Sequence, residues 1–234
     1  MVGLPGVDGR AAYSTSDRGA TAKLPLRLGA PRGWARPAGR RTVALVIPLD
    51  LPSLRAAAAA GASFGYRYFW GHQPRPDGRL SESCFSQWWP CRFTVEGQRY
   101  LSAEQFMMAE KARLFGDEEC RARILAAEQP AEAKTLGRSV RGFDEARWSQ
   151  ARFDIVTEGN VAKFGQDPTL RAFLLSTGDD VPVEASPTDA IWGIGLAESH
   201  PGARDPATWR GLNLLGFAIG RARAVLRGEL PPLR

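Results

Sequence analysis

Ser102-Ala-Glu-Gln-Phe-Met-Met-Ala-Glu-Lys111 is the stretch of sequence that most constrains the fold. Ser102 followed three residues later by Gln105 is typical of a capping box, so the stretch predicts a helix that begins at Ser102. Glu104 and Lys111 are seven residues apart, which places their side chains on one face of that helix. The pattern therefore predicts a carboxyl group and an amine on the same helix face, among apolar neighbours.

Two interpretations of this pair are open. Residues 61–234 contain three lysines, Lys111, Lys134 and Lys163, against nineteen arginines. Arginine stays charged at any accessible pH, whereas a lysine amine can lose its proton and act as a nucleophile, so the pair can be reactive. In the structural interpretation, Glu104 lies in the first helical turn because the helix dipole favours a negative charge there.

The flanking sequence predicts a mainly helical α+β domain. Phe93-Thr-Val and Arg99-Tyr-Leu flank Glu96-Gly97, which indicates a short hairpin directly before the helix. Cap residues and apolar spacing predict further helices over residues 117–127, 130–137, 144–164, 168–178 and 212–226. Residues 181–186 are expected to be extended, at a sheet edge because of their proline. We expect no parallel sheet, because strands and helices do not alternate along the chain.

The charge pattern divides the 234-residue chain. Residues 1–60 hold nine basic and three acidic residues and account for the net charge of +6, while residues 61–234 hold 22 of each sign. The folded part therefore lacks the basic character of a duplex-binding protein. Residues 1–63 are expected to be a disordered extension rich in Gly, Ala, Arg and Pro. We expect one compact domain over residues 64–228 and a short tail over residues 229–234.

The composition does not favour a metal-binding protein or a membrane protein. Cys84, Cys91 and Cys120 form no C-x-x-C pair, and His72 and His200 are the only histidines, so we expect no metal and no cofactor. No apolar run approaches the roughly 18–20 residues that cross a membrane. The unpaired cysteines are consistent with a reducing cytoplasm, which is the expected location.

Four clusters are candidates for chemistry: Phe85-Ser-Gln-Trp-Trp-Pro90, the helix start at Ser102, Arg147-Trp148, and Thr188-Asp-Ala-Ile-Trp-Gly-Ile-Gly195. The last cluster places Asp189 three residues before Trp192 and two glycines, where the backbone turns tightly or approaches a ligand. Asp189 is either an Asx-turn residue or a catalyst. Trp88, Trp148 and Trp192 are either core residues or walls of a pocket that stacks a planar base.

The order of motifs over residues 66–227 resembles the NADAR family of YbiA-like N-glycosidases. The motifs are Phe85-Ser86, Gly97, Tyr100, Glu104, Lys111, Lys134, Gly137-Arg138, Trp148, Lys163-Phe164, Thr177-Gly178, Glu184-Ala-Ser186, Asp189, Trp192-Gly193, Asn213, Gly216 and Arg223. The resemblance implies a compact single domain that hydrolyses the N-glycosidic bond between a ribose phosphate or ADP-ribose moiety and an exocyclic amine. The implied bases are pyrimidines of the riboflavin pathway or ADP-ribosylated guanine.

The resemblance also implies site residues. The catalytic positions are Glu104, Lys111, Trp148 and Asp189. The substrate-binding positions are Phe85, Ser86, Gln87, Arg138, Arg152, Trp192, Gly193 and Asn213. The chain departs from the family where Gln87 replaces the usual Asn and Trp88 the usual Phe. The extra methylene of Gln87 changes the space available to the base or sugar.

Two mechanisms and a second function class follow from these residues. A glycosylamine can open to an imine, which a neutral Lys111 can take over as a Schiff base while Glu104 or Asp189 moves protons. Alternatively, one carboxylate activates water and a second carboxyl group protonates the leaving group. The alternative function is a non-catalytic ADP-ribose or nucleotide sensor, with Arg138 and Arg152 on the phosphates. The expected partner is a nucleotide-like small molecule or ADP-ribosylated nucleic acid; the sequence predicts no oligomeric state.

Overall fold

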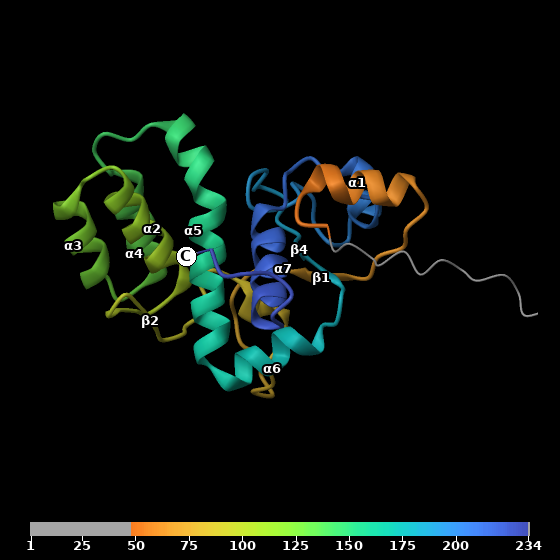
Figure 1. Cartoon of the computed structure of the whole chain (residues 1–234), viewed down its shortest axis with the longest axis horizontal. Helices are drawn as coiled ribbons and strands as arrows, with labels where there is room; N and C mark the ends of the chain where they lie inside the picture. The colour runs from red at the N-terminus through yellow and green to blue at the C-terminus, as the bar shows by residue number, and fades with distance from the viewer. Residues whose placement is uncertain (1–47, 234) are drawn as a thin grey trace, which may run out of the picture. The chain divides into compact units, whose positions relative to one another are not determined.

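The computed structural model describes residues 48–233. The predicted helix-rich α+β class is confirmed (Figure 1). The α-helices are α1 (Leu51–Ala59), α2 (Ala103–Leu114), α3 (Glu118–Ala126), α4 (Pro130–Arg138), α5 (Glu145–Gln166), α6 (Pro168–Ser176) and α7 (Leu214–Leu226). The strands are β1 (Tyr66–Phe69), β2 (Phe93–Val95), β3 (Gln98–Tyr100) and β4 (Val181–Glu184). Short 3-10 helices are η1 (Glu82–Phe85), η2 (Pro201–Arg204) and η3 (Pro206–Thr208).

Helix α2 begins as predicted, but its cap differs in one half. The Ser102 hydroxyl accepts the Gln105 backbone N–H at 3.1 Å. The Gln105 side chain does not return to Ser102; its Oε1 accepts the N–H of Leu101 at 2.8 Å, and its Nε2 donates to the carbonyls of Ile124 and Ala127 at the end of α3. Gln105 is buried, so these bonds satisfy an amide that would otherwise cost free energy. They also fix the start of α2 against α3.

The hairpin before α2 follows its local sequence. Strands β2 and β3 pair antiparallel, with Val95 opposite Gln98. Glu96 and Gly97 both have positive φ, 50° and 79°, as a two-residue type I′ turn requires. The aromatic rings of Phe93 and Tyr100 stack at 5.7 Å between centroids.

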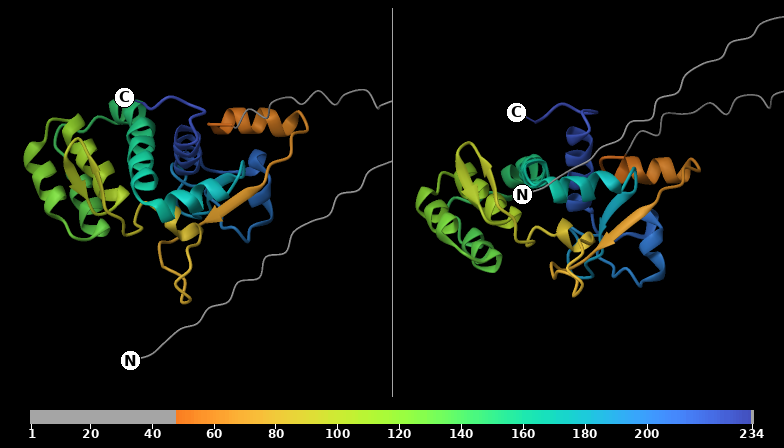
Figure 2. Two further views of the ribbon diagram at one scale, coloured as in Figure 1. Left: turned by 60° about the horizontal axis from the view of Figure 1, so that its bottom comes forward. Right: turned by 90° about the horizontal axis from the view of Figure 1, so that it is seen from below.

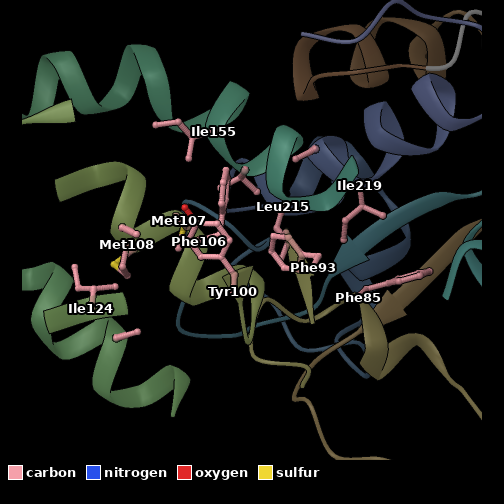
Figure 3. Packing of buried hydrophobic residues seen from close by; sticks show 14 of the residues in the cluster. Phe85, Phe93, Tyr100, Phe106, Met107, Met108, Ile124, Ile155, Leu215 and Ile219 are labelled. Carbon is pink, nitrogen blue, oxygen red and sulfur yellow. The ribbon is translucent and has the colours of Figure 1, made fainter. Parts of the chain in front are cut away.

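The larger core lies where α2, α5 and α7 meet. Helix α5 packs against α2 and against α7, and Figure 1 shows α2, α3 and α4 on the opposite side of α5 from α7. Figure 3 shows Phe106 of α2 beside Tyr100, with Leu215 and Ile219 of α7 on the side towards Phe85. The rings of Tyr100 and Phe106 meet edge to face at 5.0 Å. This core fixes the orientation of α2 relative to α7.

A second cluster corrects the expected domain boundary. Residues 51–59, predicted to belong to a disordered extension, form α1, whose Leu51 and Leu54 are buried with Trp209 and Phe217. Arg55 donates to the carbonyls of Pro206 at 2.8 Å and Trp209 at 2.9 Å. The alanine run hides this helix from composition analysis, because only two leucines on one face carry the burial. The expectation for residues 1–47 lies outside the described residues.

The expectation of no parallel sheet is wrong. Strands β1 and β4 pair in parallel, with Tyr66 opposite Val181 and Phe69 opposite Glu184, and lie side by side in Figure 2. The connection between them contains helices α2 to α6, so no local βαβ pattern in the sequence indicates the pair. Helix α7 covers β4 and begins two residues later than predicted, after Asn213 in the left-handed conformation with φ 52°. Glu184 is the last residue of β4.

Candidate active site

A cavity of about 320 Å³ opens between α2, α4, the loop after η1 and the segment that follows β4. Its volume is within the range of small-molecule sites. Its lining residues are Ser86, Gln87, Trp88, Glu104, Met107, Met108, Lys111, Lys134, Gly137, Arg138, Glu184, Asp189, Ile191, Trp192 and Leu215. Gly137 allows α4 to approach α2 here, since a Cβ at this position would collide with the Met108 side chain.

Glu104 lies on the first turn of α2, at the inner wall of the pocket. Its backbone N–H donates to the Gln87 carbonyl at 2.9 Å, and the residue is 3% exposed. Its Oε1 is buried and has no hydrogen-bond partner among the described residues. Burial raises the pKa of Glu104 to about 7; the Lys134 ammonium and the Trp88 side chain oppose this increase, and Asp189 adds to it. A carboxyl group of this kind can exchange a proton at neutral pH.

Glu184 is a pocket carboxyl group to which sequence reasoning gave no role. Its Oε2 is buried and has no hydrogen-bond partner within residues 48–233. Burial raises its pKa to about 8, Asp189 and Glu104 raise it further, and Lys134 opposes them. The Glu184-Ala-Ser motif could have indicated this residue. Burying a carboxyl group at the end of a buried strand costs free energy, so its presence there favours a functional role.

Asp189 is an Asx-turn residue, as one of its two predicted interpretations has it, and it also lines the pocket. Its Oδ1 accepts the backbone N–H groups of Ile191 and Trp192, each at 2.8 Å, as an Asx-turn residue does. The same residue lines the pocket with Trp192. The turn thus fixes the position of a carboxyl group at the pocket.

Three cationic side chains line the pocket, and they are arranged differently from the prediction. Lys111 lies on the same face of α2 as Glu104, but its Nζ donates to the Gly137 carbonyl at 2.8 Å and lies 4.2 Å from the centre of the Phe143 ring. Burial lowers the pKa of Lys111. Lys134, 5.5 Å from the Trp88 ring centre, is the cation that most lowers the pKa of Glu104. Arg138 is exposed at the rim.

Two buried residues of α5 hold the loop that carries Ser86, Gln87 and Trp88. Lys163 donates from Nζ to the Ser86 carbonyl at 2.8 Å, and Asn160 donates from Nδ2 to the Gln87 Oε1 at 3.2 Å. Because Asn160 occupies the amide oxygen of Gln87, the Gln87 NH₂ group is the end that can donate to a ligand. Sequence reasoning gave neither Asn160 nor Lys163 a role, although the scarcity of lysine was a signal for Lys163.

Five of the predicted site residues do not line the pocket. Phe85 is fully buried and packs edge to face on Phe69 at 5.6 Å. Arg152 pairs with Glu145 at 3.4 Å. The others are Trp148, Gly193 and Asn213.

These last three residues support the pocket from behind. Trp148 is buried, with Lys111 Nζ 5.7 Å from its ring centre, so it is placed to support the lysine rather than to stack on a base in the cavity. Asn213 bonds β4 through both ends of its amide, accepting from the Glu184 N–H at 3.0 Å and donating to the Pro182 carbonyl at 3.0 Å. Gly193 accepts the Asn213 N–H at 3.0 Å through its carbonyl.

Within residues 48–233, no helix is long and apolar enough to cross a membrane. The same residues contain no group of three or more His, Cys, Asp and Glu side chains that could hold a metal ion.

Comparison with known proteins places this arrangement in a family. The NADAR domain model matches residues 68–227. An N-glycosidase of Acanthamoeba polyphaga mimivirus is 46% identical over 144 residues, covering 59% of this chain and 85% of that protein. A riboflavin biosynthesis protein of Vibrio vulnificus is 33% identical over 146 residues, 62% of this chain and 36% of that protein. The NMR structure of the E. coli protein YbiA matches with a TM-score of 0.55 and 25% identity, over 72% of this chain and 88% of that one. The predicted resemblance is confirmed, and the chain belongs to the NADAR domain family.

Proposed function

We propose that this chain is an N-glycosidase that hydrolyses the bond between a ribose phosphate or ADP-ribose moiety and an exocyclic amine of a pyrimidine or guanine base. The observation that carries the proposal is one pocket lined by three carboxyl groups, those of Glu104, Glu184 and Asp189, together with Lys111 and Lys134. Two of these carboxyl groups have a pKa of about 7 or 8, which suits proton transfer at neutral pH. The naming of relatives as N-glycosidases supports the same reaction class.

The pocket also offers groups that suit the two ends of such a substrate. Lys134 and Arg138 supply positive charge for a phosphate group. Trp88 and Trp192 supply apolar ring surface for a planar base, and the Gln87 NH₂ group can donate to a base carbonyl. Arg152 lies outside the pocket, so of the two arginines predicted to contact phosphate only Arg138 keeps that role.

Lys111 is the proposed nucleophile. It lines the cavity, burial lowers its pKa, and the Gly137 carbonyl and the Phe143 ring hold its Nζ in place. Its neutral amine adds to C1 of the ring-opened glycosylamine, and the base then departs as a free amine while Lys111 keeps the sugar as an imine. Water next adds to C1 of the imine, and Glu104 takes a proton from that water. Glu104 returns this proton to the Lys111 nitrogen as the C1–N bond breaks, which frees the lysine and releases the sugar as its aldehyde.

A comparison of binding with product release tests this function against the sensor alternative. The protein is incubated with a 5-phosphoribosylaminopyrimidine and, separately, with ADP-ribosylated guanosine, and free base is followed by chromatography. The expected result is the release of many equivalents of base per protein from at least one substrate. Saturable binding in calorimetry without any release of base would reject the enzyme and favour the sensor.

A further inference from the structure

The side chain of Glu184 has no role in the steps given above. It stands at the end of β4, lines the pocket, and has a buried Oε2 with no hydrogen-bond partner among residues 48–233. A buried polar atom without a partner costs free energy, so native proteins seldom keep one without a functional reason.

The backbone around Glu184 is fixed on both sides. Its N–H donates to the Asn213 Oδ1 at 3.0 Å, and its carbonyl accepts the Ile194 N–H at 2.9 Å. Gly193 packs against that carbonyl so closely that a Cβ there would lie 2.8 Å from the oxygen. The carboxyl group is therefore carried by a rigid strand end, as a catalytic group needs to be.

Burial and the neighbouring carboxyl groups favour the neutral form of Glu184, and the cations of the pocket oppose them. From α2 come Glu104 and Lys111, from α4 come Lys134 and Arg138, and from the segment after β4 comes Asp189. Burial is the largest cause of its raised pKa, followed by Asp189. At neutral pH Glu184 is then a protonated carboxyl group with an O–H to donate, like other buried acids kept neutral for this purpose.

We propose that Glu184 is the general acid that protonates the departing base, an inference that rests on the proposed N-glycosidase function. When the C1–N bond to the base breaks, its electron pair goes to the exocyclic nitrogen, which takes the proton from the Glu184 carboxyl group. The base leaves as a neutral amine, and Glu184 becomes a carboxylate that regains a proton from solvent. The proton transfer from Glu184 to the departing nitrogen is the same whether Lys111 or water forms the new bond to C1.

The environments of the carboxyl groups separate their roles. After burial, the largest influence on the pKa of Glu104 is the Lys134 ammonium, which lowers it, whereas the largest influence on Glu184 is the Asp189 carboxylate, which raises it. The larger charge effect therefore favours the ionised form of Glu104 and the neutral form of Glu184, which suits a base and an acid respectively. Asp189 already accepts two backbone N–H groups on Oδ1, so it is assigned to positioning the substrate.

The test compares wild type, Glu184→Gln and the control Glu198→Gln, which removes a carboxyl group outside the pocket. The substrates are the 5-phosphoribosyl derivatives of aniline and 4-nitroaniline, beside the aminopyrimidine substrate. Glu184→Gln is expected to lower kcat about a hundredfold or more on the aniline and aminopyrimidine derivatives and much less on the 4-nitroaniline derivative, whose amine leaves more readily. Glu198→Gln is expected to match wild type.

The pH profile provides the second readout. The wild-type kcat/KM is expected to fall above about pH 8, and this alkaline limb is expected to be absent from Glu184→Gln. Equal losses on both aniline substrates, a limb that persists in the variant, or a wild-type profile without a limb would each overturn the role of Glu184. A wild type that cleaves none of the glycosylamines would instead reject the proposed function itself.

Discussion

Glu104→Gln is expected to make the protein more stable at pH 8, although it removes a negative charge from the first turn of α2. Gln is a neutral replacement of nearly the same shape as protonated Glu. In the folded protein the pKa of Glu104 is about 7, against an ordinary value of 4.5. At pH 8 Glu104 is ionised in both the folded protein and the unfolded chain. Burial makes the ionised form less favourable in the folded protein, so ionisation lowers the free energy of unfolding of wild type. The amide of the variant is never ionised, so the variant avoids this cost.

The size and pH window follow from the two pKa values. Between pH 4.5 and 7 the folded protein binds more protons than the unfolded chain, so wild-type stability falls as the pH rises through this range. A change from 4.5 to about 7 corresponds to about 3 kcal/mol. The variant should thus match wild type near pH 4.5 and exceed it by about 3 kcal/mol at pH 8. For a domain of this size, this is a rise in Tm of roughly 6–12 °C.

Thermal and urea unfolding at pH 5, 6, 7 and 8 measures this difference. The control is Asp117→Asn, which removes another carboxyl group at a helix start. Asp117 caps α3 and bonds the backbone and side chain of Arg141, which lowers its pKa, so Asp117→Asn should reduce stability at pH 8. A Glu104→Gln variant that is less stable than wild type at pH 8 would refute the reasoning. It would show that Glu104 is the dipole-stabilising residue of the structural interpretation.

Three further predictions test other parts of the account. Leu54→Ala should lower the free energy of unfolding in urea by about 2–5 kcal/mol, because Leu54 of α1 is fully buried. Removal of residues 1–60 should lower the stability more than removal of residues 1–47. Equal stability of the two truncated proteins would contradict the packing of α1. Lys111→Arg should be nearly inactive, and borohydride added during wild-type turnover should trap a sugar adduct on Lys111 by mass spectrometry; an active variant would exclude the Schiff base. Asp189→Asn should keep its thermal stability, since the Asn oxygen can accept the same two N–H groups, while kcat/KM falls at least about tenfold; unchanged kcat/KM would make Asp189 a turn residue only.

Local features of the fold could be predicted from the sequence because their causes are local. The Ser102 cap, the Asp144 cap of α5 and the Glu96-Gly97 turn each depend on contacts within a few residues. The parallel pairing of β1 with β4 joins Tyr66 to Val181, and no short-range pattern specifies it. Helix α1 escaped prediction for a similar reason, since its two leucines gain their burial from the distant cluster around Trp209.

The site could be predicted in part. Family motifs indicated Glu104, Lys111 and Asp189, and the structure brings all three to one pocket. The partners of each were not predictable: Lys134, not Lys111, is the cation that most affects Glu104, because α4 and α2 approach where Gly137 lacks a side chain. The order of motifs does not distinguish residues that line the pocket from residues that pack behind the lining. Trp148 and Asn213 are in the motifs but lie behind the wall.

The most direct test of the central claim is multiple-turnover release of free base from a 5-phosphoribosylaminopyrimidine by wild type, Glu104→Gln and Glu132→Gln. Glu132 is exposed on α4 outside the pocket, so its variant controls for the loss of one carboxyl group. We expect wild type and Glu132→Gln to release base at equal rates and Glu104→Gln to be about a hundredfold slower while remaining folded. A folded Glu104→Gln variant that turns over at the wild-type rate would contradict the claim that this pocket carries out the hydrolysis.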